Sequence, residues 1–518
     1  MAASNTFYVT TPIYYVNDKP HIGHAYTTLA CDVLARFMRL DGKDVRFLTG
    51  TDEHGQKVDQ SAKAAGVDTQ TYCDRVSQEF RDLAAALNVS NDDFIRTTED
   101  RHTAASQAIW QRIQEAGDIY LGSYAGWYAV RDEAFYGEEE LTDGPDGTKL
   151  APSGAPVAWV EEPSYFFKLS AWQDRLLEFY DRNPDFILPP GRRNEVVSFV
   201  KGGLRDLSVS RTSFTWGVPV PGDDKHVMYV WLDALTNYIT ALGYPDKAGM
   251  YETYWPALHI VGKDILRFHA VYWPAFLMSA GLEPPARVFA HGWWTNEGQK
   301  ISKSLGNVID PFALIEQYGL DQVRYFLMRE VPFGNDGDFS HRAMINRTNS
   351  DLANDLGNLA QRSLSIVAKH CEAKVPRPGD FSAEDQALLA AAHGLADKMR
   401  AHLDSQAIHL ALADLFQVAG DANRYIDAEA PWALRKTDRA RMDTVLYVLA
   451  ETVRHLAILV QPVMPDSANK LLDQLGVPAD ARDFAALGES GALVPGTDLP
   501  APSGVFPRFV EDTTAAAD

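Results

Sequence analysis

Residues 10–24 constrain the fold of this chain more than any other stretch, and they read T-T-P-I-Y-Y-V-N-D-K-P-H-I-G-H. The apolar residues at 7–9 are typical of a strand, and those at 45–48 predict a second strand. Between them, apolar residues recur every three or four positions and predict one buried helix face: Ile22, Tyr26, Leu29, Val33, Phe37 and Leu40. Pro20 suits the first turn of this helix, and Gly42 suits its end. The pattern predicts a strand–helix–strand unit, which binds ligands at the carboxyl ends of its strands.

His21 and His24 lie three residues apart in the first turn of the predicted helix and share one face. Free N–H groups and partial positive charge at a helix N-terminus make phosphate the expected ligand. Gly23 leaves the backbone open to close approach, and two imidazoles add hydrogen-bond donors without permanent charge. The alternative is that both histidines only cap the helix or contact water. The spacing alone leaves both interpretations open.

The charge of the chain restricts its partners. The 518 residues suffice for about two to four domains. A formal net charge of −22 argues against indiscriminate binding to nucleic acid, which requires a basic surface. Lys and Arg nevertheless outnumber Asp and Glu between 341 and 377, whereas the reverse holds between 122 and 165. A polyanion is therefore expected to contact the later part of the chain.

Cysteine content and hydropathy indicate the cellular compartment. Cys31, Cys73 and Cys371 are far apart and odd in number, which predicts neither a disulfide framework nor a zinc cluster. No basic and apolar signal segment opens the sequence, and no apolar run is long enough to span a bilayer. We expect a cytoplasmic protein without a membrane partner.

Changes in residue pattern divide the chain into segments, and the predicted fold class is α/β. A parallel sheet is expected to be split by a β-rich insertion, with one helical piece near 170–183, and to be followed by an α-helical bundle. The predicted boundaries are 1–118 and 226–290 for the two halves of the sheet domain, 119–225 for the insertion, 291–342 for a loop and connecting region, 343–475 for the bundle and 476–518 for a C-terminal extension.

Three further groups of residues are candidates for a site. Asp52 follows the second strand, where a carboxylate can hold an ammonium group or can equally cap a helix. Two stripes can be ordinary core or can wall an apolar pocket, and His269 within them can be a ligand or a satisfied buried histidine. The stripes are Trp231, Ala234, Leu235 and Tyr238, and Ile265, His269 and Trp273. Lys300 and Lys303 belong to a K-I-S-K-S stretch between glycines, which suits a mobile loop that binds polyphosphate.

The H-I-G-H and K-I-S-K-S motifs together resemble those of the class I aminoacyl-tRNA synthetases. Within that class, the chain is similar to the methionyl-tRNA synthetases over about residues 5–475. The similarity rests on these stretches: T-P-I-Y-Y-V-N-D-K-P-H-I-G-H, T-G-T-D-E-H-G, W-G-V-P-V-P, Y-V-W-L-D-A, G-K-D-I-L-R-F-H, K-I-S-K-S, N-L-A-Q-R and A-P-W. The resemblance implies a Rossmann-type sheet with a connective insertion, followed by an anticodon-binding bundle.

The resemblance also implies a role for each candidate residue. Methionine would be bound by Ile13, Tyr15, Asp52, Trp231, Ala234, Leu235, Tyr238, Ile265, His269 and Trp273, with Asp52 holding the ammonium. ATP would be bound by His21, Gly23, His24, Asp264, Lys300, Ser302 and Lys303, of which His21, His24, Lys300 and Lys303 would be catalytic. The CAU anticodon of tRNA(Met) would be read by Asn358, Arg362 and Trp432. The expected activity is ATP-dependent activation of L-methionine and its transfer to initiator and elongator tRNA.

The sequence departs from the family pattern in a few places. Ile301 stands where the family has Met, which is a mild apolar exchange. The insertion lacks the zinc-binding cysteines of many relatives, which implies the zinc-free branch, with ATP and Mg²⁺ as the substrate complex and no metal bound by the protein itself. No oligonucleotide-binding domain follows the bundle, so a monomer is expected.

Other functions fit the sequence less well. Leucyl, isoleucyl and valyl enzymes of the class are much longer, and a cysteinyl enzyme needs thiolate-bound zinc. A small-molecule nucleotidylyltransferase would share the first motif but not the helical bundle. An RNA-binding module built on an inactive synthetase is the non-enzyme alternative, and it would bind tRNA without ATP turnover.

Overall fold

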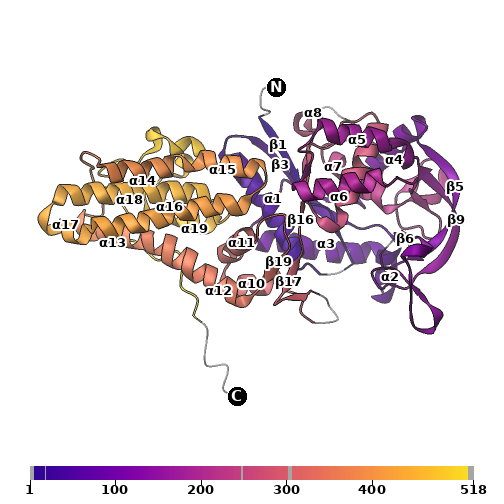
Figure 1. Cartoon of the computed structure of the whole chain (residues 1–518), viewed down its shortest axis with the longest axis horizontal. Helices are drawn as coiled ribbons and strands as arrows, with labels where there is room; N and C mark the ends of the chain where they lie inside the picture. The colour runs from indigo at the N-terminus through magenta and orange to yellow at the C-terminus, as the bar shows by residue number, and fades with distance from the viewer. Residues whose placement is uncertain (1–4, 18, 133, 247–248, 302–305, 511–518) are drawn as a thin grey trace, which may run out of the picture.

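The computed structural model describes residues 5–510, apart from 18, 133, 247–248 and 302–305. The molecule is elongated, with an α/β body at one end and a helical body at the other (Figure 1). None of the helices in these ranges is long and apolar enough to cross a membrane.

The predicted strand–helix–strand unit is confirmed. β1 (Thr6–Thr10) and β3 (Asp44–Asp52) pair in parallel, and α1 (Ile22–Leu40) connects them. The predicted apolar stripe of α1 is buried except at Leu40, which is partly buried. Pro20 precedes the helix cap at His21, so its predicted place in the first turn is wrong. Gly42 follows the helix with a φ of +83°, a conformation that glycine adopts without strain.

The main sheet has seven strands among the residues described, and every pairing in it is parallel. Its order is β10-β16-β15-β1-β3-β2, with β4 beside β3. The further strands are β2 (Tyr14–Tyr15), β4 (Asp93–Arg96), β10 (Ile187–Leu188), β15 (Leu258–Gly262) and β16 (Arg287–His291). Strands β3, β2 and β4 build outward from one side of β1, and strands β15, β16 and β10 from the other. A crevice is therefore expected at the carboxyl ends of β1 and β15.

Helices cover the sheet and support the crevice. They are α2 (Gln56–Ala64), α3 (Thr69–Ala86), α4 (Asp100–Glu115), α7 (Val230–Thr240), α8 (Met250–Tyr254) and α9 (Trp273–Ser279). The predicted stripe from Ile265 to Trp273 runs through irregular helical turns into α9. Helices and strands alternate on both sides of the β-rich segment, as the sequence pattern predicted.

The β-rich segment forms an antiparallel sheet at the end of the molecule farthest from the helical body (Figure 1). Its order is β11-β9-β5-β6, and two smaller sheets of β7–β8 and β12–β14 accompany it. The strands are β5 (Ile119–Ala129), β6 (Ala134–Tyr136), β7 (Thr142–Asp143), β8 (Lys149–Leu150), β9 (Ala158–Phe167), β11 (Leu207–Ser208), β12 (Ser210–Arg211), β13 (Pro219–Val220) and β14 (Asp223–Met228).

This segment contains one more helix than the sequence pattern indicated. α5 (Gln173–Arg182) matches the predicted helical piece, but α6 (Pro190–Lys201) was missed. The apolar residues of α6 lie only at 196, 197, 199 and 200, in the second half of the helix, so the stripe is too short to predict a helix over 190–201. β10 lies between the two helices and pairs with β16 of the main sheet, so this part of the segment belongs structurally to the parallel sheet.

A small sheet and two helices connect the α/β body to the helical body. The elements are β17 (Trp294–Asn296), β18 (Gln299–Lys300), α10 (Pro311–Tyr318), α11 (Leu320–Arg329) and β19 (Gly337–Phe339). Glu297 and Gly298 both have positive φ and join β17 to β18 as a two-residue hairpin loop. β16 and β17 are separated at Gly292, where the backbone of Asn335 approaches so closely that a Cβ would lie 2.3 Å from it.

The predicted helical bundle is confirmed. It consists of α12 (His341–Arg347), wide helical turns at Thr348–Gly357, α13 (Asn358–His370), α14 (Ala383–His393), α15 (Leu395–Asp404), α16 (Ile408–Glu429), α17 (Pro431–Thr437), α18 (Arg439–Val460) and α19 (Pro465–Gln474). α18 is buried from Thr444 onward, and α13, α14, α16, α17 and α19 all pack against it. After 476 the described chain forms short helical turns, and one of them places Phe484 against Phe37 of α1.

A buried ion pair joins the two bodies. Arg324 of α11 has no exposed surface, and its Nη2 lies 2.7 Å from the carboxylate of Asp32 on α1. The same guanidinium donates to the carbonyl oxygens of Leu87, Val463 and Pro462 at 2.8–2.9 Å. Burial alone would raise the pKa of Asp32, but the nearby guanidinium groups outweigh burial and lower it. This carboxyl group is therefore charged at neutral pH.

We predict that Arg324→Met destabilises the protein by about 3–5 kcal/mol, since it leaves a buried carboxylate with too few partners. Urea unfolding at pH 7 measures this loss. Arg400→Met is the matched control, because Arg400 also connects the two bodies, through Asp41 at 2.6 Å, but its side chain is 41% exposed. The control should cost about 0–1 kcal/mol. Equal losses in the two variants would contradict the role of burial.

Candidate functional site

A cavity of about 420 Å³ opens at the carboxyl edge of the main sheet. The segments that follow β1 and β15, the end of β3 and the N-terminus of α1 form its floor, and α7 forms one wall. It is lined by these predicted site residues: Ile13, Tyr15, His21, Gly23, His24, Asp52, Trp231, Ala234, Leu235, Tyr238, Asp264, Ile265 and His269. Residues from four distant stretches of the sequence thus meet where the strand order predicted a crevice.

Backbone N–H groups at the start of α1 hold the rings of His21 and His24 in fixed orientations. Nδ1 of His21 accepts the N–H of Gly23 at 3.1 Å, and Nδ1 of His24 accepts the N–H of His21 at 3.1 Å. Because both Nδ1 atoms accept a hydrogen bond, a neutral ring must carry its proton on Nε2. The histidines therefore do cap the helix, as one interpretation of the sequence held, and they also line the cavity.

Burial keeps both rings neutral. It lowers the pKa of His21, and burial together with the neighbouring His21 lowers the pKa of His24 well below its usual value. The ring centroids lie 3.9 Å apart, so two imidazolium ions at these positions would repel each other. At neutral pH this end of the cavity offers Nε2–H donors and the N-terminus of a helix, which together suit an anion.

The apolar wall is made of aromatic and aliphatic side chains on α7 and the turns before α9. Tyr238 donates its hydroxyl proton to Nε2 of His269 at 2.6 Å, because Nδ1 of His269 faces the carbonyl oxygen of Ile265 at 3.0 Å. Burial lowers the pKa of His269 to about 4, so this ring is neutral as well. The wall therefore presents polarizable rings without net charge, which suit an uncharged, polarizable side chain.

Trp273 does not line the cavity, although it was predicted with the residues that do. It is fully buried behind Tyr238, with the two ring centroids 6.2 Å apart. Its indole N–H donates to Nε2 of His259 at 3.3 Å, and Nδ1 of His259 in turn lies 2.8 Å from Thr10 Oγ1. Trp273 supports the wall from behind instead of forming part of its surface.

Asp52 is the carboxylate on the floor of the cavity. It ends β3 and is only 7% exposed. The alternative that Asp52 caps a helix is wrong, since α2 begins at Gln56 and is preceded by Gly55. A carboxylate at the base of an otherwise uncharged wall is suited to a cationic group such as an ammonium.

A buried carboxylate lies behind the same wall. Asp233 of α7 lies 2.6 Å from Nδ1 of His54 and 2.7 Å from Nε2 of His102. Burial alone would raise the pKa of Asp233, but the two histidines outweigh burial and lower it. This group connects α7 to α4 and to the segment just after Asp52, and so fixes the spacing between the wall and the floor.

The rim of the cavity is more polar. Asp264 is exposed, and its Oδ1 accepts the indole N–H of Trp293 at 3.2 Å. Lys263 lies 4.5 Å from the ring centroid of Trp293 and pairs with Asp336 at 2.6 Å. Trp231 stacks on Phe268 with centroids 3.5 Å apart. A flat aromatic surface beside a carboxylate is suited to a nucleoside.

The second predicted phosphate-binding segment is described only in part. Lys300 ends β18, is exposed and does not line the cavity. Its carbonyl oxygen accepts the side-chain N–H of Asn307 at 3.1 Å, which closes the base of the loop. Ser302 and Lys303 lie outside the described residues.

The predicted anticodon residues lie in the helical body, on elements far from the cavity (Figure 1). Asn358 begins α13, and Arg362 follows one turn later. The guanidinium of Arg362 lies 5.5 Å from the ring centroid of Trp432 on α17 and 2.6 Å from Asp427. Trp432 is 44% exposed, so a planar base can stack on it.

Sequence reasoning missed several residues that line the cavity. They are Pro12, Tyr14, Thr27, Lys57, Arg131, Asp132, Val230, Gly262, His291 and Trp293. His291 ends β16 at the same sheet edge, so its position along a predicted strand could have indicated it. Arg131 and Asp132 belong to the turn after β5, and nothing local in the sequence places that turn against the cavity.

In the described part of the chain, one group places three possible metal ligands within 4.8 Å of one another: His393, Glu451 and His455. Protein groups already occupy two of these ligands, Glu451 and His455. Arg454 donates to both carboxylate oxygens of Glu451 at 3.0–3.1 Å. Nδ1 of His455 lies 3.0 Å from the carbonyl oxygen of Glu451, and Nε2 lies 2.9 Å from that of Leu487. We therefore assign no metal to this group. The three cysteines are free, buried and separate.

Comparison with protein families gives two matches. The family model "tRNA synthetases class I (M)" matches residues 7–364, and the model "Anticodon binding domain of methionyl tRNA ligase" matches residues 375–517. Relatives from Brucella suis biovar 1 (strain 1330) and Mycobacterium bovis (strain ATCC BAA-935 / AF2122/97) are named methionine–tRNA ligase and are 64% and 59% identical. The alignments cover 98% and 97% of this chain and 98% of each relative.

Solved structures give the same result. The Mycobacterium tuberculosis methionyl-tRNA synthetase in complex with methionyl-adenylate is 58% identical, covers 97% of this chain and 100% of its own, and superimposes with a TM-score of 0.95. The apo form of that enzyme gives a TM-score of 0.89 at 55% identity, over 98% of this chain and 99% of its own.

We predict that His269 makes the protein less stable as pH falls from 6.5 to 4. The unfolded chain binds a proton at this residue below about pH 6.5, whereas the folded protein resists protonation until about pH 4. This difference lowers the free energy of unfolding by roughly 3 kcal/mol as the pH falls from 6.5 to 4. Above pH 6.5 it has no effect. In urea unfolding, the stability advantage of the wild type over His269→Gln should shrink by that amount between pH 7 and pH 4. Parallel pH curves would contradict this prediction.

Proposed function

Since the chain belongs to the methionyl-tRNA synthetases and is a methionine–tRNA ligase, we propose that this cavity binds methionine and ATP side by side and forms methionyl-adenylate. One observation carries the proposal. A single cavity of about 420 Å³ contains a buried carboxylate, an uncharged aromatic wall and two neutral histidines at a helix N-terminus. These three features match the ammonium, the thioether and the phosphates of the two substrates.

Methionine occupies the wall and the floor. Its ammonium binds Asp52, and its thioether lies among Leu235, Tyr238 and His269, where polarizable aromatic edges favour sulfur. Ile13, Tyr15, Trp231, Ala234 and Ile265 complete the predicted subsite, and Trp273 supports it from behind. The neutral state of His269 favours an uncharged side chain over a lysine or arginine of similar length.

ATP occupies the other end of the cavity as its Mg²⁺ complex. His21 and His24 donate their Nε2–H groups to phosphate oxygens, and Gly23 leaves the helix N-terminus accessible. Asp264 binds the ribose, while Lys300, Ser302 and Lys303 approach the phosphates as a loop. Of these residues, His21, His24, Lys300 and Lys303 stabilise the charge that develops on the phosphates.

The reaction has two steps. A carboxylate oxygen of methionine attacks the α-phosphorus of ATP, and the bond from that phosphorus to the bridging oxygen breaks to release pyrophosphate. A ribose hydroxyl of the terminal adenosine of tRNA then attacks the methionyl carbonyl, loses its proton and releases AMP. No side chain forms a covalent intermediate, so the rate depends on positioning and on electrostatic stabilisation.

The helical body selects the tRNA. Asn358, Arg362 and Trp432 read the CAU anticodon of initiator and elongator tRNA(Met) by stacking and by hydrogen bonds to base edges. We further propose that the enzyme acts as a cytoplasmic monomer and needs no zinc, because its cysteines are single and buried and the insertion contains none.

Amino-acid-dependent ATP–pyrophosphate exchange without tRNA tests the proposal. Exchange should occur with methionine and with no other of the standard amino acids. Exchange with a different amino acid would retain the reaction but contradict the assignment of the pocket. If folded protein binds tRNA without any exchange, the alternative of an RNA-binding module on an inactive synthetase is correct.

We predict that Trp432→Ala lowers kcat/KM for charging of tRNA(Met) by roughly tenfold or more, because one base loses a stacking partner worth about 1–3 kcal/mol. Pyrophosphate exchange should not change, since it does not involve the helical body. Arg435→Ala is the matched control: it removes an exposed side chain three residues along the same short helix and should charge normally. Normal charging by Trp432→Ala would exclude the anticodon role.

A further inference from the structure

A second carboxylate lies directly beside the ammonium-binding position and has no part in the proposed reaction. Glu53 follows Asp52 in the chain, and consecutive residues of an extended segment point in opposite directions. Asp52 lines the cavity, whereas Glu53 is buried with none of its surface exposed. A buried carboxylate of this kind persists only when it is fully hydrogen-bonded.

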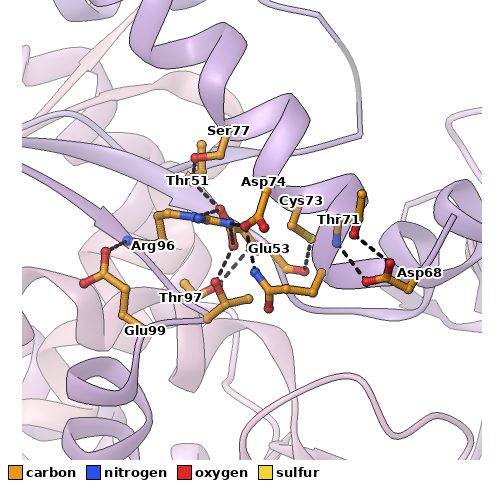
Figure 2. Close-up of polar contacts among 12 residues, drawn as sticks. Thr51, Glu53, Asp68, Thr71, Cys73, Asp74, Ser77, Arg96, Thr97 and Glu99 are labelled. Carbon is orange, nitrogen blue, oxygen red and sulfur yellow. Dashed lines mark hydrogen bonds and ion pairs between the residues drawn. The ribbon is translucent and has the colours of Figure 1, made fainter.

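The side chain of Glu53 has four close donors. Its Oε1 accepts from Thr51 Oγ1 at 2.8 Å and from Arg96 Nε at 2.7 Å. Its Oε2 accepts from Arg96 Nη2 at 3.0 Å and from Thr98 Oγ1 at 2.5 Å. Figure 2 shows the ion pair of Arg96 with Glu53. Because both oxygens are occupied, Glu53 cannot itself bind a substrate cation.

The backbone of Glu53 is fixed as well. Its N–H donates to Thr97 Oγ1 at 2.9 Å, as Figure 2 shows, and its carbonyl accepts the indole N–H of Trp216 at 2.6 Å. On the other side, the carbonyl of Asp52 accepts the N–H of Val16 at 3.1 Å. The peptide that carries the Asp52 side chain is therefore held at both ends and cannot rotate.

Arg96 is the centre of this arrangement. It ends β4 next to Thr51 of β3, and its Nη2 also lies 2.5 Å from Asp74 of α3 (Figure 2). Its guanidinium therefore connects β3, β4 and α3 through a planar fork, which a lysine cannot reproduce. Buried ion pairs contribute little to stability on balance, so stability alone does not account for this one.

We propose that Glu53 and Arg96 form a clamp that positions the carboxylate of Asp52 for the ammonium of methionine. The proposal rests on the ammonium-binding role of Asp52 given above. Glu53 and Arg96 are positioning residues, because they act through Asp52 and do not touch the substrate. A binding group must be held within about 0.5 Å of its productive position, so the placement of this carboxylate matters for the charge-assisted hydrogen bond that it makes.

Two ligands separate positioning from general stability. Methioninol carries the ammonium but no carboxylate, and 4-(methylthio)butanoate carries the carboxylate but no ammonium. In calorimetric titrations of the full-length enzyme, Arg96→Lys should raise the Kd of methioninol by about tenfold, the expected loss for one charged hydrogen bond. The Kd values of 4-(methylthio)butanoate and of ATP should stay within about twofold, since neither ligand uses the ammonium contact.

The matched control is Arg101→Lys. Arg101 makes a similar forked pair with Asp93, at 2.8 and 3.0 Å, just beyond the end of β4 but does not contact Glu53. It should leave the binding of both ligands unaffected while it disturbs a forked ion pair, whose arginine side chain is more exposed (42%) than that of Arg96 (20%). Glu53→Gln, which keeps the shape of the side chain, is measured in parallel. It should lower the affinity for methioninol but not that for 4-(methylthio)butanoate. The clamp is refuted if these variants lose equal affinity for both ligands, or if they bind methioninol as tightly as the wild type.

The Asp52→Asn background distinguishes this proposal from the one on which it rests. If Asp52 binds the ammonium, Asp52→Asn lowers the affinity for methioninol, and adding Arg96→Lys lowers that affinity no further. If Asp52→Asn leaves methioninol binding intact, the assigned role of Asp52 fails, and the clamp fails with it. If the two substitutions weaken methioninol independently, Asp52 keeps its role and only the clamp is overturned.

Discussion

A guanidinium without solvent contact fixes the relative placement of the two bodies of this enzyme. Arg324 lies where α1, the end of α3 and the turn before α19 meet, and each of its partners comes from one of those segments. Partial separation of the bodies would remove the Arg324 guanidinium from its partners without exposing it to water. A continuous apolar core, from α1 through α11 into the bundle, surrounds the ion pair. The cavity and the anticodon residues are therefore held at a fixed separation.

Local rules of helix capping also determine the chemistry of the cavity. The same hydrogen bonds that satisfy the first N–H groups of α1 decide which nitrogen of each histidine carries a proton. The capping of α1 therefore also orients the two Nε2–H donors that line the cavity. Burial then keeps those donors uncharged at neutral pH, so an incoming polyphosphate does not displace a preformed ion pair.

Much of the fold follows from periodic patterns in the sequence. The stripe of α1, the strands at 7–9 and 45–48 and the bundle after 343 were predictable because each buries one regular face. Asp52 was ambiguous in the sequence, and the start of α2 at Gln56 removed the helix-cap alternative. α6 and β10 were missed, since the apolar stripe of α6 covers only its second half and β10 contains only two residues.

The site was less predictable where it depends on packing between distant segments. Trp273 shares a stripe with His269, but the helical turns between them are irregular and rotate Trp273 behind Tyr238. Arg131 reaches the cavity only because the turn after β5 folds back over it. Neither position can be predicted from the local sequence, because both depend on how one element packs on another. The roles of individual site residues, Ser302 and Lys303 among them, stay predictions.

The pairing of β10 with β16 has a consequence for the modularity of the chain. An insertion attached only at its two ends could be removed or exchanged as a cassette. Here the inserted segment supplies the outermost strand of the main sheet. A shortened enzyme without it would expose the backbone of β16 as a bare sheet edge and invite association between molecules. The inserted segment is thus a structural part of the main sheet and not a separable module.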